Sequence, residues 1–218
     1  MARKTRELAL ETRHRLLDAA ELLFDRQGVA ATSLQQIATE ADATRGAVYW
    51  HFRNKADLLD ALLHNRVRQP LSALADSLLL QAQAASLQAP LDRVLHLLLG
   101  LAEGISADPA VRRTLGIAIF KVERGVDGDL KHIMGQSRSQ GMLDLHSLIE
   151  CLLNQPGPDI QASPPDATRA ASGLAMIFEG LLFGWLLDLN DAPADTPPAQ
   201  GLPERMRHVM NAYLRGLG

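Results

Sequence analysis

The sequence predicts an all-α protein of about nine helices, with an N-terminal three-helix head and a larger helical body. Leu and Ala are abundant, runs of β-branched residues are scarce, and the aromatic residues number only five Phe, two Tyr and two Trp among 218 residues. This composition favours helices over sheet. A hydrophobic content of 47% also indicates a globular chain rather than a disordered one.

The first predicted helix carries a single apolar stripe. The stripe recurs at helical spacing and consists of Leu16, Leu17, Ala20, Leu23 and Phe24. Gly28 follows, and glycine is common just beyond the last turn of a helix, so we expect the helix to end there. This helix is expected to pack behind the segment that follows it.

Three helix starts are legible within residues 33–57. Ser33 and Gln36 have the spacing of a capping box, Thr44 can cap a second short helix, and Asn54 with Asp57 can cap a third, longer one. Two short helices joined by a turn of three or four residues form a helix-turn-helix, a motif that reads DNA.

The second of these helices is rich in residue types that contact DNA. Arg45 can read a guanine bidentately, Thr44 can touch a phosphate or a thymine methyl, and Gly46 lets the backbone approach the duplex. Lys55 begins the next helix, where a cation is unfavourable unless an anion is near. The predicted DNA interface therefore consists of Ser33, Thr44, Arg45, Gly46, Tyr49, Trp50, His51 and Lys55. The alternative is a short amphipathic helix pair that only fills a core.

The segment TRGAVYWHFRNKADLL, following GVAATSLQQIA, resembles the DNA-binding domain of the TetR family of transcriptional regulators. The opening residues, MARKTRELALETRHRLLDAAELLFDRQ, are similar to the subgroup of AcrR-type repressors of multidrug efflux operons. The resemblance is strong over about residues 1–65 and weaker afterwards. It implies a DNA-binding domain over 1–65 and a ligand-binding and dimerisation domain over 66–218.

The charge distribution agrees with this division. The net charge is −3, but residues 1–55 have a balance of +2 and the remainder has −5. Arg3, Lys4 and Arg6 are expected to form a basic arm before the first helix, which can lie along the DNA backbone or remain disordered.

Nothing in the sequence indicates export. The N-terminus lacks the apolar stretch of a signal peptide, and we expect no apolar run long enough to cross a bilayer. A lone cysteine, Cys151, excludes an internal disulfide framework and is expected to be a small buried hydrophobe. The cytoplasm is the expected compartment.

Proline and glycine divide the rest of the chain. Pro70 should kink or break the helix that begins near Asn54, because its ring clashes with the preceding turn and it lacks an N–H. Later boundaries are expected at Pro90, at Asp108–Pro109, at 125–128 and in the Pro-rich stretches 154–165 and 190–203.

The last two predicted helices are apolar enough to serve a partner. Small residues alternate with large apolar ones over 166–188, and a second stripe follows near the C-terminus. Paired across a two-fold axis they form a four-helix bundle, as the resemblance also implies. The predicted interface is Leu174, Ile177, Phe178, Leu181, Trp185, Met206, Val209, Met210 and Tyr213. The alternative is that both helices only complete a monomeric core.

The resemblance further implies a small-molecule pocket in the body. Material for apolar walls and polar contacts is present at His96, Phe120, Glu123, Met134, Met142, His146, Phe178, Glu179, Phe183 and Trp185. Glu123 or Glu179 can attract a cationic drug. The alternative for each residue is ordinary core packing.

These predictions together describe a dimeric repressor of a multidrug efflux operon, which binds a palindromic operator in double-stranded DNA and is released by a small hydrophobic or cationic ligand. Control of a catabolic or lipid operon is the alternative within this class. A helical enzyme and a pure interaction protein are more distant alternatives, since no HExxH, P-loop, GxSxG or CxxC motif occurs. No catalytic residue, metal or cofactor is expected, and neither is contact with a membrane.

Overall fold

A computed structural model of the chain describes residues 2–84, 89–122, 128–155, 166–191 and 201–216. The described residues form ten α-helices and one π-helical turn, with no strand among them. Because α4, η1 and α5 follow one another without a non-helical residue, they count as one helix, and the predicted all-α class with about nine helices is confirmed. In chain order the elements are α1 (Ala2–Ala31), α2 (Leu34–Glu40), α3 (Arg45–His51), α4 (Lys55–Leu63), η1 (His64–Arg68), α5 (Gln69–Ala84), α6 (Pro90–Ala107), α7 (Pro109–Phe120), α8 (Gly128–Asn154), α9 (Ala167–Asp191) and α10 (Leu202–Gly216).

The chain forms two compact units, and each combines segments that are distant in sequence. Unit 1 comprises residues 1–69 and 110–138, and unit 2 comprises 70–109 and 139–218. Unit 1 therefore contains not only the predicted head but also α7 and the first part of α8. The predicted functional boundary after residue 65 stays a prediction.

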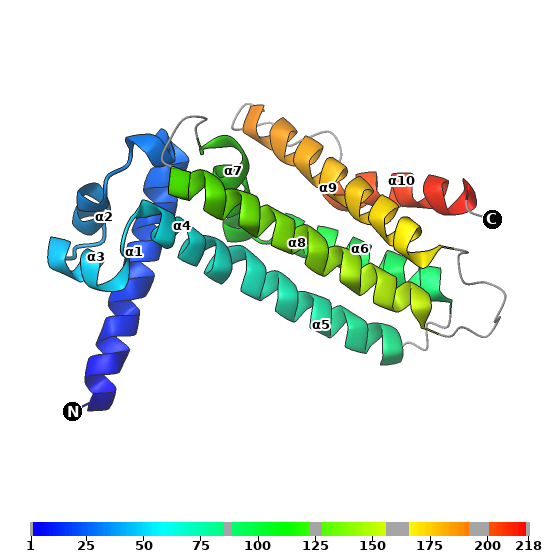
Figure 1. Cartoon of the computed structure of the whole chain (residues 1–218), viewed down its shortest axis with the longest axis horizontal. Coiled ribbons are helices and arrows are strands. Elements are labelled where there is room, and N and C mark those ends of the chain that lie inside the picture. The colour runs from blue at the N-terminus through cyan, green and yellow to red at the C-terminus, as the bar shows by residue number, and fades with distance from the viewer. Residues whose placement is uncertain (1, 85–88, 123–127, 156–165, 192–200, 217–218) are drawn as a thin grey trace. The chain divides into compact units, whose positions relative to one another are not determined.

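In unit 1, α1 packs against α2, α3 and α4, as predicted (Figure 1). Leu16, Ala20 and Phe24 are fully buried, and they meet a core to which α2, α3 and α4 also contribute. The other fully buried large side chains of this core include Ile37, Val48, Leu58, Leu59 and Leu62. The apolar stripe of the first helix thus holds the two short helices in place.

The three predicted caps are present. The Ser33 hydroxyl accepts from the Gln36 N–H at 3.2 Å, and the Gln36 side-chain oxygen accepts from the Ser33 N–H at 2.8 Å. Thr44 Oγ1 accepts from the Ala47 N–H at 3.1 Å, and Asn54 Oδ1 accepts from the Asp57 N–H at 2.8 Å. These bonds satisfy helix-terminal donors and fix where each short helix begins.

The regular part of the first helix ends at Gly28, as predicted, but one further helical turn follows. Helical structure resumes after Gly28 and continues to Ala31, so that Gly28 forms a kink inside α1, with φ 82° and ψ 162°. A side chain would be strained at this positive φ, which explains why glycine occupies the kink. The kink directs the residues after it toward the start of α2.

The expected disruption at Pro70 takes the form of a π-helical turn. Gln69 donates its N–H to the His64 carbonyl five residues back, in place of the usual four. The wider turn precedes the proline and lets the helix continue into α5 despite the missing N–H. Side chains add bonds to nearby carbonyls, since Asn65 donates to the Ala61 oxygen at 2.6 Å and Arg68 to the Asp60 oxygen at 3.2 Å.

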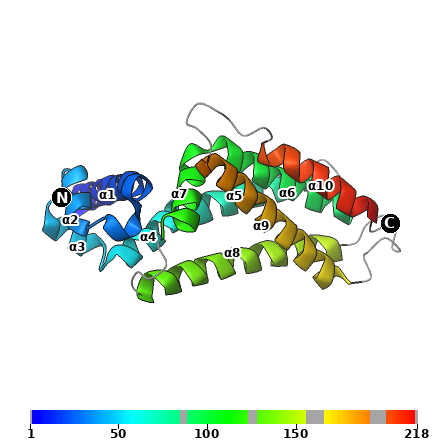
Figure 2. The ribbon, with the colours of Figure 1, turned by 90° about the horizontal axis from the view of Figure 1, so that it is seen from above.

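Unit 2 is held together by close approaches between helices. A Cβ at Gly100 would clash with the Leu78 side chain, and one at Gly104 with the Leu74 side chain, so these glycines admit the leucine ridge of α5 against α6. Helix α10 packs along α6 and also contacts α9 (Figure 2). An ion pair between Arg205 and Asp188, at 2.6 Å, joins α10 to α9.

The expectation that no apolar run reaches the length of a membrane span is wrong for α9. This helix has 25 residues, and an 18-residue window within it has a mean hydropathy of 1.7, which meets the requirement for a span by length and composition. Its many Ala and Gly residues hide this in the sequence, since they separate the large apolar side chains. The core helix of a soluble protein passes the same test, and several α9 side chains are buried in unit 2.

Candidate nucleic-acid interface

Helix α3 presents one face to the core of unit 1 and the other to solvent. Val48 is fully buried and anchors the helix, whereas Arg45 and Gly46 are exposed. Tyr49 is 50% exposed and Trp50 73% exposed, which is unusual for large aromatic side chains and leaves them free to meet a ligand. This exposed face carries most of the side chains predicted to contact DNA.

The exposed face is partly pre-organised. The Arg45 guanidinium lies over the Tyr49 ring, 5.5 Å from its centroid, a cation–π contact that restricts both side chains. A Cβ at Gly46 would meet only Thr44 Oγ1, at 3.9 Å. Nothing within the described part of the chain therefore requires glycine at this position, and the space in front of it is open.

His51 lies at the end of α3, where it is half-buried. Its ring meets the Trp50 ring edge-on, with centroids 4.5 Å apart. Burial lowers the pKa of His51, and the nearby Arg13 charge lowers it further. The lowered pKa favours the neutral ring, which can offer a phosphate one N–H donor.

A cleft of about 480 Å³ lies beside this face. It brings together four of the eight residues predicted to contact DNA, from the start of α2, from α3 and from the start of α4. The cleft is lined by Ala30, Ala31, Thr32, Ser33, Leu34, Gln35, Arg45, Tyr49 and Lys55. Of the other four, Thr44, Gly46 and Trp50 lie on the exposed side of α3 or its cap, and His51 is half-buried.

Lys55 has a different partner from the one that the sequence suggested. Its ammonium donates to the Val29 carbonyl at 2.9 Å and to the Ala30 carbonyl at 3.0 Å. These carbonyls lie at the end of α1, where the helix dipole is negative, so the cation is compensated within the chain. An anion is therefore not needed to explain a cation at the start of α4, and the predicted phosphate contact of Lys55 stays a prediction. Lys55 also lines the cleft.

Two polar cleft residues, Thr32 and Gln35, were missed by reasoning from the sequence. Thr32 is buried and donates to the Gly28 carbonyl at 2.7 Å, so it closes the turn after the kink. Gln35 is exposed in the first turn of α2. Its position two residues after the cap was the available signal, because side chains in the first turn of a helix lie beside its free N–H groups.

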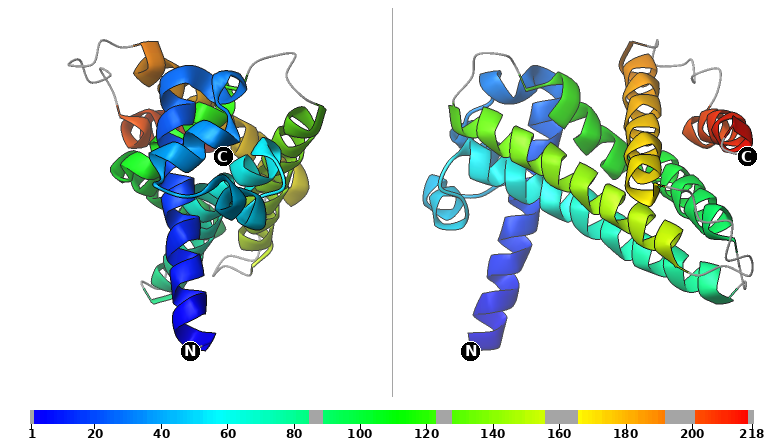
Figure 3. Two further views of the ribbon diagram at one scale, coloured as in Figure 1. Left: turned by 90° about the vertical axis from the view of Figure 1, so that its left-hand side faces the viewer. Right: turned by 45° about the vertical axis from the view of Figure 1, so that its right-hand side comes forward.

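The expected basic arm is part of α1. The helix begins at Ala2, so Arg3, Lys4 and Arg6 lie in its first turns rather than in an extended segment before it. Figure 3 shows these turns projecting beyond α2 and α3. The prediction of an arm is therefore wrong, because the charged residues between 3 and 15 are compatible with helix.

The residues predicted for an effector pocket are spread over both units. Phe120 lies in unit 1, whereas His96, Met142, His146, Phe178, Glu179, Phe183 and Trp185 lie in unit 2. Glu123 and the Met134 side chain lie outside the described residues. Phe178 and Trp185 are buried, Phe183 is 46% exposed, and the others are half-buried. The pocket stays a prediction.

His146 takes part in a polar contact between α8 and α9. Its Nε2 lies 3.1 Å from Ser172 Oγ, and its Nδ1 lies 3.8 Å from a Glu150 carboxylate oxygen. Two other ring nitrogens, His96 Nε2 and Trp185 Nε1, are buried and have no hydrogen-bond partner among the described residues. An unsatisfied buried polar group costs about 1–3 kcal/mol, so such atoms need an explanation.

Five of the nine residues predicted for a dimer interface are buried within a single chain. Leu174, Phe178, Trp185, Met206 and Met210 are at most 6% exposed. Ile177, Leu181, Val209 and Tyr213 are half-buried. The exposed large apolar residues of α9 are Met176, Phe183 and Leu187. A partner can reach these three, which lie on a different face of α9 from the buried Leu174, Phe178 and Trp185.

Cys151, expected to be buried, is exposed, because α8 turns this position away from the core of unit 2.

A helix-turn-helix with an exposed reading helix, in a chain that continues into further helices, defines the class of this protein: a DNA-binding regulator. Residues 16–62 match the family profile described as bacterial regulatory proteins, tetR family. The transcriptional regulator TtgR of Pseudomonas putida is 37% identical over 188 residues, which cover 86% of each protein, and AcrR of Shigella flexneri is 32% identical over 85% of this chain and 83% of that protein. The chain belongs to the TetR family of transcriptional regulators.

The solved structure of an efflux-pump repressor is also similar to this chain. The crystal structure of NalD, the secondary repressor of the MexAB-OprM multidrug efflux pump in Pseudomonas aeruginosa, matches with a TM-score of 0.72 and 30% identity, over 96% of this chain and 97% of that one. The predicted membership of the family is confirmed. The similarity also extends well beyond residue 65, further than the sequence alone suggested.

Proposed function

We propose that this protein represses a multidrug efflux operon by binding its operator as a dimer, and that a small hydrophobic or cationic ligand releases it. The observation that carries the DNA-binding part is the cleft in which Ser33, Arg45, Tyr49 and Lys55 converge beside the exposed face of α3. The efflux part is supported by NalD, which represses an efflux pump and is similar over nearly the whole chain.

The residues of the interface divide into two roles. Ser33, Tyr49 and Lys55 offer donors to phosphates, which position the protein and make affinity depend on salt. Arg45 and Trp50 lie on the exposed side of α3, where Arg45 can pair with a guanine edge and the Trp50 ring can pack against a thymine methyl. Gly46 between them admits the DNA backbone.

Dimerisation is supported by the outward face of α9. Met176, Phe183 and Leu187 are exposed there, and a Cβ added at Gly180 or Gly184 would meet no described atom within 4 Å. This face lets two α9 helices approach closely and bury apolar side chains that the single chain leaves in water. Two heads about 34–36 Å apart then read successive major grooves, and the operator is palindromic.

The effector site is supported by the unpartnered nitrogens in unit 2. A ligand with hydrogen-bond acceptors would satisfy Trp185 Nε1, which is buried without a partner among the described residues. Glu179 adds a negative charge on the same helix for a cationic compound. Binding that favours a state with the heads away from operator spacing shifts the population and releases the DNA. The protein acts in the cytoplasm, where its DNA partner lies.

Two experiments test this proposal. In vitro selection with the full-length protein and a random duplex library should yield a palindrome, to which the protein binds in a gel shift. Triclosan, a neutral phenol, and tetraphenylphosphonium, a lipophilic cation, are then added as probes, and at least one should release the selected duplex. Selection of no preferred sequence would refute operator binding, and retention of the duplex with both probes would refute regulation by these classes of ligand.

A further inference from the structure

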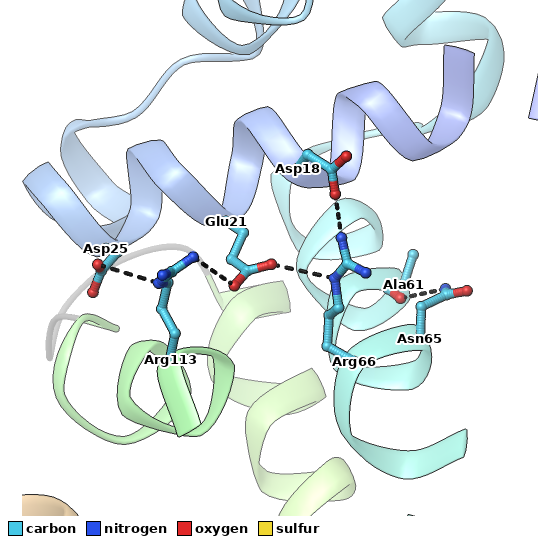
Figure 4. A network of polar contacts seen from close by, with 7 residues as sticks. All are labelled: Asp18, Glu21, Asp25, Ala61, Asn65, Arg66 and Arg113. Atoms are coloured by element: carbon cyan, nitrogen blue, oxygen red, sulfur yellow. Dashed lines mark hydrogen bonds and ion pairs between the residues drawn. The ribbon is translucent and has the colours of Figure 1, made fainter. Parts of the chain in front are cut away.

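In the part of the chain that the structure describes, Glu21 of α1 is the one buried titratable side chain, with 4% of its surface exposed. Two guanidinium groups from other elements reach its carboxylate (Figure 4). Arg66 of η1 donates from Nε to Oε2 at 3.2 Å, and Arg113 of α7 donates from a terminal nitrogen to Oε1 at 3.3 Å. All three residues belong to unit 1.

The two arginines extend the network to both sides of Glu21. Arg66 also pairs with Asp18, and Arg113 Nε lies 3.8 Å from Asp25. Burial raises the pKa of Glu21, while the neighbouring positive charges act in the opposite direction. Since a buried carboxylate is unfavourable without partners, the positions of Arg66 and Arg113 relative to α1 are tightly constrained. The network therefore fixes where α7 lies on α1.

A second contact joins the other end of α7 to α1. The Val29 N–H donates to the carbonyl of Lys121, the residue that follows α7, at 3.1 Å. Val29 comes directly after the kink at Gly28, where the backbone N–H groups leave the regular helical pattern. Helix α7 thus contacts α1 near its start through Arg113 and at its end through Lys121.

The segment after the kink leads directly to the DNA-reading cleft. The carbonyls of Val29 and Ala30 accept from the Lys55 ammonium, and Ala30 and Lys55 both line the cleft with Arg45 and Tyr49. The short segment Gly28–Ala30 therefore donates one backbone N–H to the residue that follows α7, and two of its carbonyls accept from the first residue of α4.

We propose that Arg113 is a positioning residue for operator binding: its ion pair with Glu21 holds α7 on α1, and α7 in turn holds the Gly28–Ala30 segment and Lys55 in the arrangement that reads DNA. The proposal rests on the proposed DNA-binding function. It adds a role for a helix outside the helix-turn-helix. Because the chain enters α7 directly from α6 of unit 2, this role also gives the body a covalent route to the reading cleft.

The test compares Arg113→Ala with Arg207→Ala in the full-length protein. Both changes remove the positive charge of a partly exposed, ion-paired arginine, but Arg113 pairs with Glu21 and Asp25 in the network, whereas Arg207 pairs with Glu103 in unit 2, away from it. The probe is the duplex selected by the wild-type protein. Arg113→Ala should weaken binding by about fivefold or more, whereas Arg207→Ala should match the wild type.

Two further measurements separate positioning from general loss of structure. Circular dichroism should show that Arg113→Ala keeps its helical content, and Arg113→Lys should recover part of the affinity. Hydrogen–deuterium exchange of a peptide covering residues 26–34 should be faster in Arg113→Ala than in Arg207→Ala, since the Val29 N–H loses its fixed acceptor. If Arg113→Ala does not fold, Arg113→Lys and Glu21→Gln give the same comparison through milder changes.

The outcomes distinguish the inference from the function on which it rests. If wild-type protein binds no selected duplex, the proposed function fails. If the wild type binds and Arg113→Ala binds equally well, with unchanged exchange at 26–34, the positioning role is overturned.

Discussion

Replacing Gly46 with Ala should strengthen the fold and weaken DNA binding at once. The position is exposed and helical, and the added methyl would meet only Thr44 Oγ1, at 3.9 Å, so the free protein accepts it without strain. Alanine is favoured over glycine in a helix by up to about 1 kcal/mol. For a chain of this size this gain raises the melting temperature by about 1–4 °C.

The added methyl should disturb the protein only when DNA is bound, where it lowers the affinity for the duplex. If the backbone at Gly46 approaches the duplex closely, the methyl overpacks the interface, and such overpacking costs about 1–3 kcal/mol, or roughly 30-fold in affinity at its midpoint. Thermal melting and gel shifts with the selected duplex at fixed salt measure the two effects. Gly141→Ala is the matched control, since Gly141 is also helical, with nothing within 4 Å of its added Cβ, and lies in unit 2. It should gain stability and keep its affinity. Unchanged affinity in Gly46→Ala would refute the close approach.

Three other predictions concern the caps, the buried carboxylate and the dimer. Ser33→Ala removes the capping box of α2 and should lower the free energy of unfolding by about 1 kcal/mol in urea titrations; no change would mean that the cap is not needed. Burial raises the pKa of Glu21 above its usual 4.5, so the folded state holds this proton more tightly than the unfolded state does. The free energy of unfolding of the wild type should therefore fall, relative to that of Glu21→Gln, as pH rises above about 4.5. A difference between the two proteins that is independent of pH would contradict this. Met176→Glu should produce monomers in sedimentation velocity, whereas Leu80→Glu, at a similarly exposed site on α5, should stay dimeric; a dimeric Met176→Glu protein would exclude this face of α9.

The sequence predicted the helix-turn-helix well because its signals are local. The caps at Ser33, Thr44 and Asn54 each depend on residues three positions apart, and each is present in the structure. The exposed face of α3 followed from its composition, since side chains that hydrogen-bond or stack were crowded where a packing helix would have apolar ones. Local patterns of this kind are set by the geometry of a single turn.

What the sequence did not show depends on contacts between distant segments. Lys55 was placed near a phosphate because its position in its own helix is unfavourable, but its partners are carbonyls of α1, 25 and 26 residues earlier. The pairing of Glu21 with Arg113 joins residues 92 positions apart, and no periodicity connects them. The outward face of α9 was also hidden, because a helix that is apolar nearly all round gives no register. The π-helical turn before Pro70 lets the helix continue despite the clash of the proline ring with the preceding turn. Local sequence rules predict only a kink or a break at this position.

DNA reading by the exposed face of α3 is tested most directly by the affinity of wild type and Arg45→Ala for the selected duplex and for variants of it, measured across a range of salt concentrations. Arg45→Ala should lose about 1–3 kcal/mol of binding free energy, mainly by relaxing the preference at one base pair of each half-site. The dimer should remain intact. Equal affinity of both proteins for every duplex would show that this face of α3 does not read DNA.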